Sequence, residues 1–436
     1  MTNTAISKNF LQHTAGPYIR VKSRHSAYHV STAEQKGTTM AEITGKILVE
    51  RARALVPDLR ARGQAAEESE RIPEETIEDV RNAGLFQAVV PKRYGGYEIE
   101  YKYIPQIFRE LGRGCTSTSW TLGFLIYHNF QFAHFPEQAQ DDVWSSKGYA
   151  MTPGQVMPSG TAEPVEGGFR LTGRWGYVTG ILHGDWMLFS APVTGSGNDN
   201  DPDTGPDIRR FFVPVSECKV HDTWHVSAMR ATGSRDVELE DVFVPEHRQI
   251  RVSELRNGNG PGLKINTGLL WRVPLLTLMV YGAVAPLLGA AEAMLEIVSD
   301  ILKIKVGAYT GARLQHQMST RIRLAQNKVL LDATRGLFDD KIDFVWDVIS
   351  RGDSLTSEQR LEARLVTNHI ARTSQAIVNE LAIDAGSRAT FLDSPIQRFQ
   401  RDVNSLVTHA IFDVDGVGNL YGGVMMGQEV PPNAMI

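Results

Sequence analysis

Three residues with rings recur at every fourth position in one stretch of the chain. Trp120, Phe124 and His128 lie in STSWTLGFLIYHNFQF, and this spacing places them on one face of a helix. A histidine on such an apolar face is most often a core residue whose ring nitrogens are satisfied by its neighbours. A histidine can also take part in proton transfer, because the pKa of imidazole lies near neutrality.

A second histidine that could transfer a proton lies near the end of the sequence. His409 follows the pair Arg401 and Asp402 in RFQRDVNSLVTHAIFD, a segment with helical character. Two further histidines, His221 and His225, are four residues apart in HDTWH. That segment reads as a strand, in which the two side chains would be about 13 Å apart, so no metal site is expected there.

Hydroxyl groups are a third kind of candidate. In GFRLTGRWGYVTG, strand alternation predicts one face that carries Phe169, Leu171, Trp175, Tyr177 and Thr179. The row of rings therefore ends in a hydroxyl group. A half-buried strand packed on the core is the more ordinary explanation of such a row, and the sequence alone leaves a binding role open.

A turn and an arginine could contact the polar parts of a ligand. Thr232, Gly233 and Ser234 form a predicted tight turn, whose hydroxyl and N–H groups could hold a phosphate or the polar edge of a cofactor. An ordinary Gly-Ser turn has the same residues. Arg272 precedes the apolar run VPLLTLMVYGAVAPLLGAA, and a buried guanidinium there would need either a salt bridge or a ligand.

The elements that must position these residues fall into three stretches. Residues 40–150 have the apolar spacing of helices, residues 151–255 have the period-two pattern of short strands, and residues 256–436 return to long helices. The sequence therefore predicts an α+β fold with an N-terminal helical domain, a central β-barrel or sandwich and a C-terminal helical bundle. Residues 1–39 show neither pattern, so we expect a poorly ordered extension, and Met40 could be an alternative start.

The composition limits the partners of the chain. Its 436 residues are 42% hydrophobic and 22% charged, as in soluble globular proteins, and the net charge of -5 comes without a basic stripe. Nucleic acid and membranes are therefore not expected as partners. Cys115 and Cys218 form no CxxC pattern, which favours a reducing compartment, the cytoplasm. Residues 273–291 could span a bilayer by length, but their glycines and prolines favour a helix buried in the bundle.

The order of the three stretches resembles the acyl-CoA dehydrogenase fold. The motifs that carry a closer resemblance, to the flavin-dependent aromatic monooxygenases of this fold, are IEDVRNAGLFQAVVPKRYGG, GRWGYVTGILHGDW, WHVSAMRATGSRDVELEDVFVPEHR and FQRDVNSLVTH. They touch all three stretches. The resemblance implies a C-terminal four-helix bundle, a homotetramer, and reduced flavin (FADH2 or FMNH2) with O2 as co-substrate. Since no dinucleotide motif is present, a separate NAD(P)H:flavin reductase would supply the reduced flavin.

The resemblance also implies contacts with the flavin. The isoalloxazine ring would lie near Trp175, and the Thr179 hydroxyl would lie near N5, where the family usually has serine. Thr232, Ser234 and Arg272 would contact the cofactor as well.

A substrate site is implied on the helix that carries the three rings. His128 would lie beside the aromatic substrate together with Trp120, Phe124 and Gly154. Relatives that hydroxylate phenols usually have a serine near the position of Gly154, and here Thr152 is the closest hydroxyl. A site with one polar anchor fewer should prefer a less polar ring, so indole-like substrates are expected ahead of simple phenols.

The C-terminal motif distinguishes two chemistries. Acyl-CoA dehydrogenases commonly have a tyrosine and a glutamate after the Arg–Asp pair, and the glutamate often removes an α-proton. This chain has His409 and Ala410 there, so that base is missing, although some dehydrogenases have it on another helix. The resemblance implies an oxygenase in which His409 hydrogen-bonds or protonates a C4a-hydroperoxyflavin and so contacts the cofactor. An FAD-dependent acyl-CoA dehydrogenase, a nitroalkane-oxidase-like enzyme and a non-catalytic flavoprotein are the alternatives.

Overall fold

The computed structural model describes most of the chain: residues 43–196, 206–307, 311–432 and 434–436. Residues Ile43–Ile436 form one compact unit. The extension predicted for residues 1–39, and Met40 after it, lie outside the described residues.

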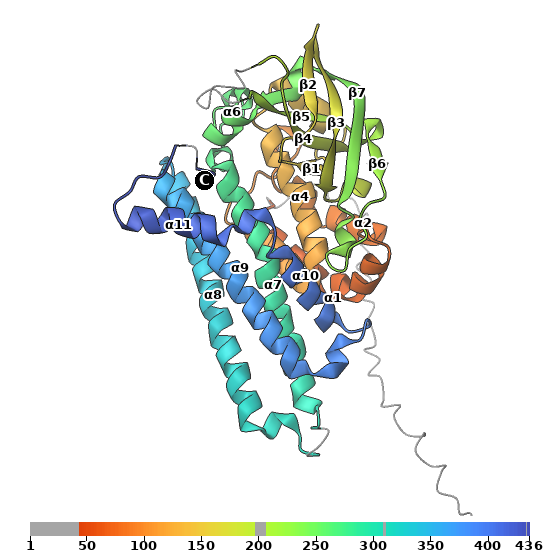
Figure 1. The fold of residues 1–436 in the computed structure, drawn as a ribbon, viewed down its shortest axis with the longest axis vertical. Coiled ribbons are helices and arrows are strands. Elements are labelled where there is room, and N and C mark those ends of the chain that lie inside the picture. The colour runs from red at the N-terminus through yellow and green to blue at the C-terminus, as the bar shows by residue number, and fades with distance from the viewer. Residues whose placement is uncertain (1–42, 197–205, 308–310, 433) are drawn as a thin grey trace, which may run out of the picture. The chain divides into compact units, whose positions relative to one another are not determined.

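Helices form the first part of this unit: α1 (Gly45–Glu68), α2 (Glu74–Asn82), α3 (Tyr103–Gly114), α4 (Thr116–Phe132) and α5 (Glu137–Trp144). All residues of α4 except Phe124 are buried, because α4 packs against α3, α7 and α10. In Figure 1, α4 is the orange helix between the strands and the long helices. The helix that carries the predicted substrate residues is therefore central.

The middle part is a sandwich of two four-stranded sheets. One sheet has the order β1 (Gly154–Gln155), β4 (Trp186–Pro192), β5 (Ile208–Pro214) and β8 (Gln249–Arg251). The other has the order β2 (Thr161–Val165), β3 (Gly168–Val178), β7 (Arg235–Pro245) and β6 (Lys219–His221). All neighbours are antiparallel except β1 and β4, which are parallel.

Alternate residues of β4 and β5 face two different cores. Phe189 and Phe211 belong to the core between the two sheets, whereas Leu188 and Phe212 belong to the large core shared with the helices. This alternation follows from the period of two in a strand. Both faces of the β1–β4–β5–β8 sheet are therefore covered.

Long helices complete the unit: α6 (Val252–Asn257), α7 (Leu275–Ile304), α8 (Met318–Ser350), α9 (Ser357–Ala385), α10 (Pro395–Leu406) and α11 (Val414–Met425). Figure 1 shows α7, α8 and α9 running side by side, with α10 beside α7. By length and composition α7 could cross a membrane, but 89% of its most apolar window is buried inside the protein. The prediction of a helix buried in the bundle is confirmed.

The predicted order of helices, strands and helices is confirmed, and the strands form a sandwich. The limits at residues 150 and 255 remain sequence divisions: α5 ends at Trp144, β1 begins at Gly154, and α6 follows β8 directly. Among the short 3-10 helices, η5 (Arg230–Thr232) and η11 (Ala410–Phe412) belong to the site described next.

Candidate active site

Four rings form a row that connects α4 to the segment after α10. Trp120, Phe124 and His128 meet edge to face along α4, with 5.1 Å between successive ring centroids. His409 meets Trp120 edge-on at 5.2 Å. The predicted common face of α4 is thus present, and the tertiary fold adds His409 to its end.

The hydrogen bond of His128 determines which ring nitrogen can accept. Its Nδ1 lies 2.8 Å from the carbonyl oxygen of Thr152, and since a carbonyl only accepts, Nδ1 carries the proton. Nε2 is therefore an acceptor, and it is buried without a partner among the described residues. Burial lowers the pKa of His128 to about 3, so the imidazole is neutral at physiological pH. This environment makes His128 a hydrogen-bond acceptor and a poor proton acceptor.

His409 has the opposite arrangement. The predicted helical character of this segment is present as α10, but that helix ends at Leu406, and His409 caps η11. The backbone N–H of Ile411 donates to its Nδ1 at 3.1 Å, so the neutral ring carries its proton on Nε2. Desolvation lowers the pKa of His409. Although its ring packs on Trp120, His409 keeps contact with solvent, and its Nε2 presents a donor where His128 presents an acceptor.

Gly154 lies against the His128 ring. A Cβ atom at this position would come within 2.9 Å of His128 Cε1 and within 2.8 Å of the Leu188 carbonyl oxygen. A serine therefore does not fit while His128 keeps its position. The hydroxyl of Thr152 is nearby in sequence, fully buried, and without a hydrogen-bond partner among the described residues.

Three hydroxyl groups form a directed chain beside the sandwich. The Thr232 hydroxyl lies 2.8 Å from the Met229 carbonyl, to which it can only donate. It must then accept from Ser234, 2.7 Å away, and Ser234 in turn must accept from Thr179, 2.9 Å away. The Thr179 proton is thereby used, and its oxygen keeps lone pairs for another donor. We call this chain the hydroxyl relay.

The predicted row of rings on β3 is broken by an irregular pairing between β3 and β7 after Trp175. Tyr177 adopts a positive φ of 59° and is 72% exposed, whereas Val178 turns into the core. Trp175 is 0% exposed inside the sandwich, and its indole N–H donates to the Ser190 carbonyl at 2.9 Å. The expected contact of Trp175 with a cofactor is therefore not supported. Tyr177, two residues before Thr179, is the exposed ring on this strand.

Asp402 connects three parts of the site. Its carboxylate accepts a hydrogen bond from the Ser117 hydroxyl on α4 at 2.5 Å and from the Met229 N–H at 2.6 Å. Burial raises the pKa of Asp402, and these two hydrogen bonds oppose that rise. Its neighbour Arg401 instead contacts Glu67. The sequence showed the Arg–Asp pair, but this role required the tertiary structure.

Arg272 differs from its prediction. Its side chain is exposed, so the argument that a buried guanidinium needs a partner does not apply. No side-chain hydrogen bond or salt bridge joins it to another of the residues that the structure describes. Arg272 is therefore available to a ligand, and the salt-bridge alternative has no support.

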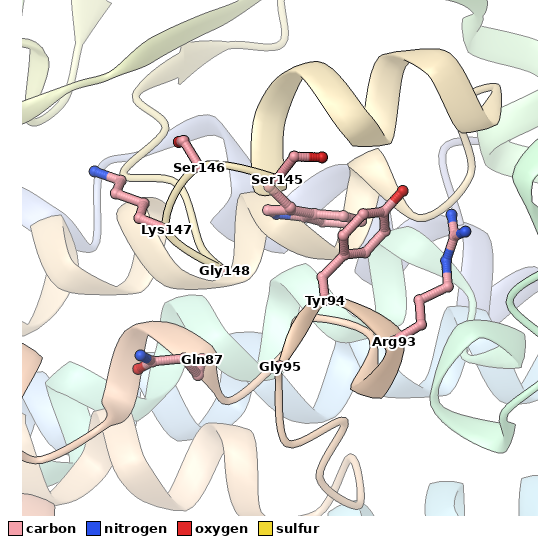
Figure 2. Close-up of a pocket in the computed structure, with 9 residues that line it drawn as sticks. Gln87, Arg93, Tyr94, Gly95, Ser145, Ser146, Lys147 and Gly148 are labelled. Carbon is pink, nitrogen blue, oxygen red and sulfur yellow. The ribbon is translucent and has the colours of Figure 1, made fainter.

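Two other features do not belong to this site. A polar hollow of about 500 Å³ lies between the segment after α5 and η2 (Lys92–Tyr94), and Figure 2 shows the residues that line it. Its cations are paired, Arg93 with Glu137 at 2.6 Å and Lys147 with Asp185 at 2.6 Å. None of the predicted site residues lines it.

A surface group with the ligand types of a metal site is also present. Glu70, Asp222 and His225 bring ligand atoms within 4.8 Å of one another. Glu70 is paired with Arg230 at 2.8 Å and Asp222 with Arg235 at 3.0 Å. Ion pairing accounts for this group.

The residues present fit a reduced flavin. The free lone pairs of Thr179 can accept from the N5–H group, and Tyr177 offers an exposed ring two residues earlier. Asp402 hydrogen-bonds both α4 and the segment of the hydroxyl relay, so the Thr179 oxygen and the aromatic row on α4 are fixed relative to each other.

Comparison with known proteins gives the family. Models of the acyl-CoA dehydrogenase N-terminal and C-terminal domains match residues 45–147 and 281–414. The pigment production hydroxylase of a Rhodococcus species is 30% identical over 388 residues, covering 87% of this chain and 96% of that protein. The oxygenase component of the FADH2-dependent resorcinol hydroxylase of a Rhizobium species is 30% identical over 401 residues, covering 88% and 94%.

A solved structure agrees with these relatives. XiaF from a Streptomyces species, in complex with FADH2 and glycerol, has a TM-score of 0.82 and 28% identity, covering 90% of this chain and 98% of that chain. The predicted resemblance is confirmed. The chain belongs to the reduced-flavin-dependent monooxygenases of the acyl-CoA dehydrogenase fold, as the oxygenase component of such a system.

Proposed function

We propose that the substrate is a small aromatic or heteroaromatic molecule with one ring O–H or N–H group, which donates to Nε2 of His128. The observation that carries this proposal is the orientation of His128: Thr152 fixes its tautomer, and Nε2 is a buried acceptor without a partner among the described residues. A buried polar atom of this kind is costly unless something pairs with it. A bound phenol or indole would supply that donor.

One set of residues contacts the cofactor, and another contacts the substrate. Reduced flavin, when bound, supplies the chemistry that activates O2 for transfer to the ring. Thr179 accepts a hydrogen bond from the N5–H group of the flavin. Tyr177 lies beside the isoalloxazine ring, in the role that the sequence suggested for Trp175. Arg272 offers the flavin an exposed cation. His409, whose Nε2 carries the ring proton, would donate that proton to the oxygen that the bound flavin activates. FADH2 is the preferred flavin, since two relatives are named or solved with it.

His128 strengthens the ring as a nucleophile by hydrogen bonding. With its pKa lowered by burial to about 3, it accepts the substrate hydrogen bond without taking the proton fully. The rings of Trp120 and Phe124 lie between His128 and His409, and their apolar surface excludes water from this part of the site. Because a serine does not fit at Gly154, a phenol oxygen has one polar anchor fewer than in relatives with that serine, and we rank indole-like rings above simple phenols.

The test supplies the protein with an unrelated flavin reductase, NADH and O2, and measures hydroxylated product and H2O2. His128→Phe keeps a ring and removes the acceptor, whereas His134→Phe removes another buried histidine that lies outside the row. We expect product to fall about tenfold or more in His128→Phe only, with H2O2 rising. Equal product in both variants would refute the role of His128. Competition between indole and 4-hydroxyphenylacetate ranks the two ring types.

The assembly and the partner protein are also proposals. Met318, Ile322, Val329 and Leu330 expose apolar surface along α8, and we infer that a second copy of the chain covers it in a homotetramer. A monomer found by light scattering at micromolar concentration would contradict this assembly. A separate reductase supplies the reduced flavin. The two free cysteines agree with a reducing compartment, for which we propose the cytoplasm.

A further inference from the structure

We propose that Arg210 recognises a carboxylate on the substrate, so that the natural substrate is an aromatic acid. This assignment rests on the proposed function, because it describes the same site at His128. It is carried by three features: the burial of Arg210, the lack of an acidic partner among the described residues, and the hydrogen bond that joins Arg210 to β1, the strand whose Gly154 lies against His128.

Arg210 lies on the face of β5 that is turned toward the helices. In IRRFFVP, Arg210 and Phe212 share one face, and Phe212 belongs to the large core that includes α4. Arg210 is 4% exposed. Its neighbour Arg209 points the other way and pairs with Asp207 at 2.9 Å.

The guanidinium of Arg210 is poorly satisfied. Its Nη1 donates to the carbonyl oxygen of Gln155 at 3.1 Å, and its Nε is buried without a partner. No carboxylate of the described residues lies within salt-bridge distance of it, and burial is the cause that lowers its pKa to about 10. The side chain therefore stays charged at neutral pH. A buried, charged and unpaired guanidinium is costly, which indicates that an anion completes the site.

The two-residue strand β1 connects Arg210 to the substrate site. Arg210 binds the carbonyl of Gln155, and the preceding Gly154 lies against the ring of His128. The charge of Arg210 also contributes, after burial, to the low pKa of His128. With the unpartnered Thr152 hydroxyl, the interior around β1 offers an acceptor at His128, a hydroxyl and a cation.

The complement of this set is a molecule with a ring donor and an anionic group. A carboxylate suits Arg210, because a guanidinium presents parallel N–H groups to its two oxygens. The donor would be the O–H of a phenol or the N–H of an indole, held by His128. An arylacetic acid combines these groups in one small molecule, and the same ring without the carboxylate would leave Arg210 unpaired.

The test compares ligands that differ only in the carboxylate. The pairs are indole-3-acetate with 3-methylindole, and 4-hydroxyphenylacetate with 4-methylphenol. Binding to the full chain is measured by calorimetry without oxygen, in the presence of reduced flavin. Arg210→Met removes the charge, Arg210→Lys keeps it, and Arg209→Met is the matched control on the other face of the strand.

We expect the wild-type protein and Arg209→Met to bind each acid at least about tenfold more tightly than its neutral partner. Arg210→Met should bind both members of a pair alike, with the affinity for the neutral member unchanged, and Arg210→Lys should keep part of the preference. Equal affinities in the wild type would overturn the assignment, and so would an Arg210→Met variant that weakens both members equally. If Arg210→Met does not fold, the wild type and Arg210→Lys decide.

The outcome is separable from that of the proposed function, because binding is measured without turnover. A wild-type protein that prefers the acids but forms no hydroxylated product with oxygen would contradict the proposed function and leave the assignment of Arg210 in place.

Discussion

Replacing Thr179 by valine should increase the share of reduced flavin that is wasted as H2O2. Valine has nearly the same shape as threonine and lacks the oxygen that the hydroxyl relay keeps free to accept. Thr179→Ser keeps that oxygen and should behave like the wild type. Ser234→Ala removes the acceptor that orients the Thr179 proton, so it should have an intermediate effect.

The size of the effect follows from one hydrogen bond. A neutral hydrogen bond contributes about 1 kcal/mol net, which corresponds to about fivefold in a rate or an equilibrium constant. Thr179→Val should therefore raise the ratio of H2O2 to product about fivefold. Since the relay acts on the flavin only through the Thr179 oxygen, Ser234→Ala should add nothing in a chain that already carries Thr179→Val.

The assay mixes protein with reduced flavin and substrate, adds O2, and measures H2O2 and product for each flavin oxidised. Thermal unfolding of every variant separates a change at the site from a loss of fold, because Ser234→Ala also leaves buried hydroxyl groups without a partner. The same ratio in the wild type and in Thr179→Val would refute the role of the hydroxyl. A full additional effect of Ser234→Ala in the double variant would show that the relay acts elsewhere.

Two further predictions concern the histidines. His409→Ala should keep the fold but lower product about tenfold or more and raise H2O2, because the Nε2 donor is lost; unchanged yields of both would remove His409 from the mechanism. Burial lowers the pKa of His128 to about 3 and those of His134 and His183 to about 4. In the unfolded chain these histidines take up protons near pH 6.5, whereas in the folded chain they stay neutral there. The free energy of unfolding is therefore highest above pH 6.5 and falls as the pH drops toward 4. Measured by urea unfolding, the free energy of unfolding should fall by roughly 2 kcal/mol for each of these histidines between pH 7 and pH 5. In His134→Phe this fall should be smaller by the contribution of one histidine. The same dependence of the free energy of unfolding on pH in His134→Phe and the wild type would contradict this.

The parts of the site that depend on local spacing could be predicted from the sequence. Trp120, Phe124 and His128 share a helix face because positions four apart always do, and that relation survives folding. The turn of Thr232 and Ser234 was also visible. Their connection to Thr179 was not, because it depends on how two distant strands approach each other.

The errors have equally specific causes. Strand alternation failed at Tyr177, because a non-glycine residue with positive φ gives no signal in composition or periodicity. The apolar helix after Arg272 predicts that this arginine is buried, but Arg272 precedes the helix and is exposed. Arg210 gives little signal in the sequence, because adjacent arginines in a strand point to opposite faces, and the tertiary fold decides how each face is covered.

The hydrogen bonds of Asp402 have a consequence for the order in which the site is built during translation. Ser117 precedes Asp402 by 285 residues and Met229 precedes it by 173. At about 5–20 residues per second, the ribosome finishes Ser117 about 15 to 60 seconds before Asp402 emerges. In that interval neither the Ser117 hydroxyl nor the Met229 amide has its final acceptor. A nascent chain therefore cannot fix the N5 acceptor beside the aromatic row until α10 has docked, so the site is completed only at the end of translation.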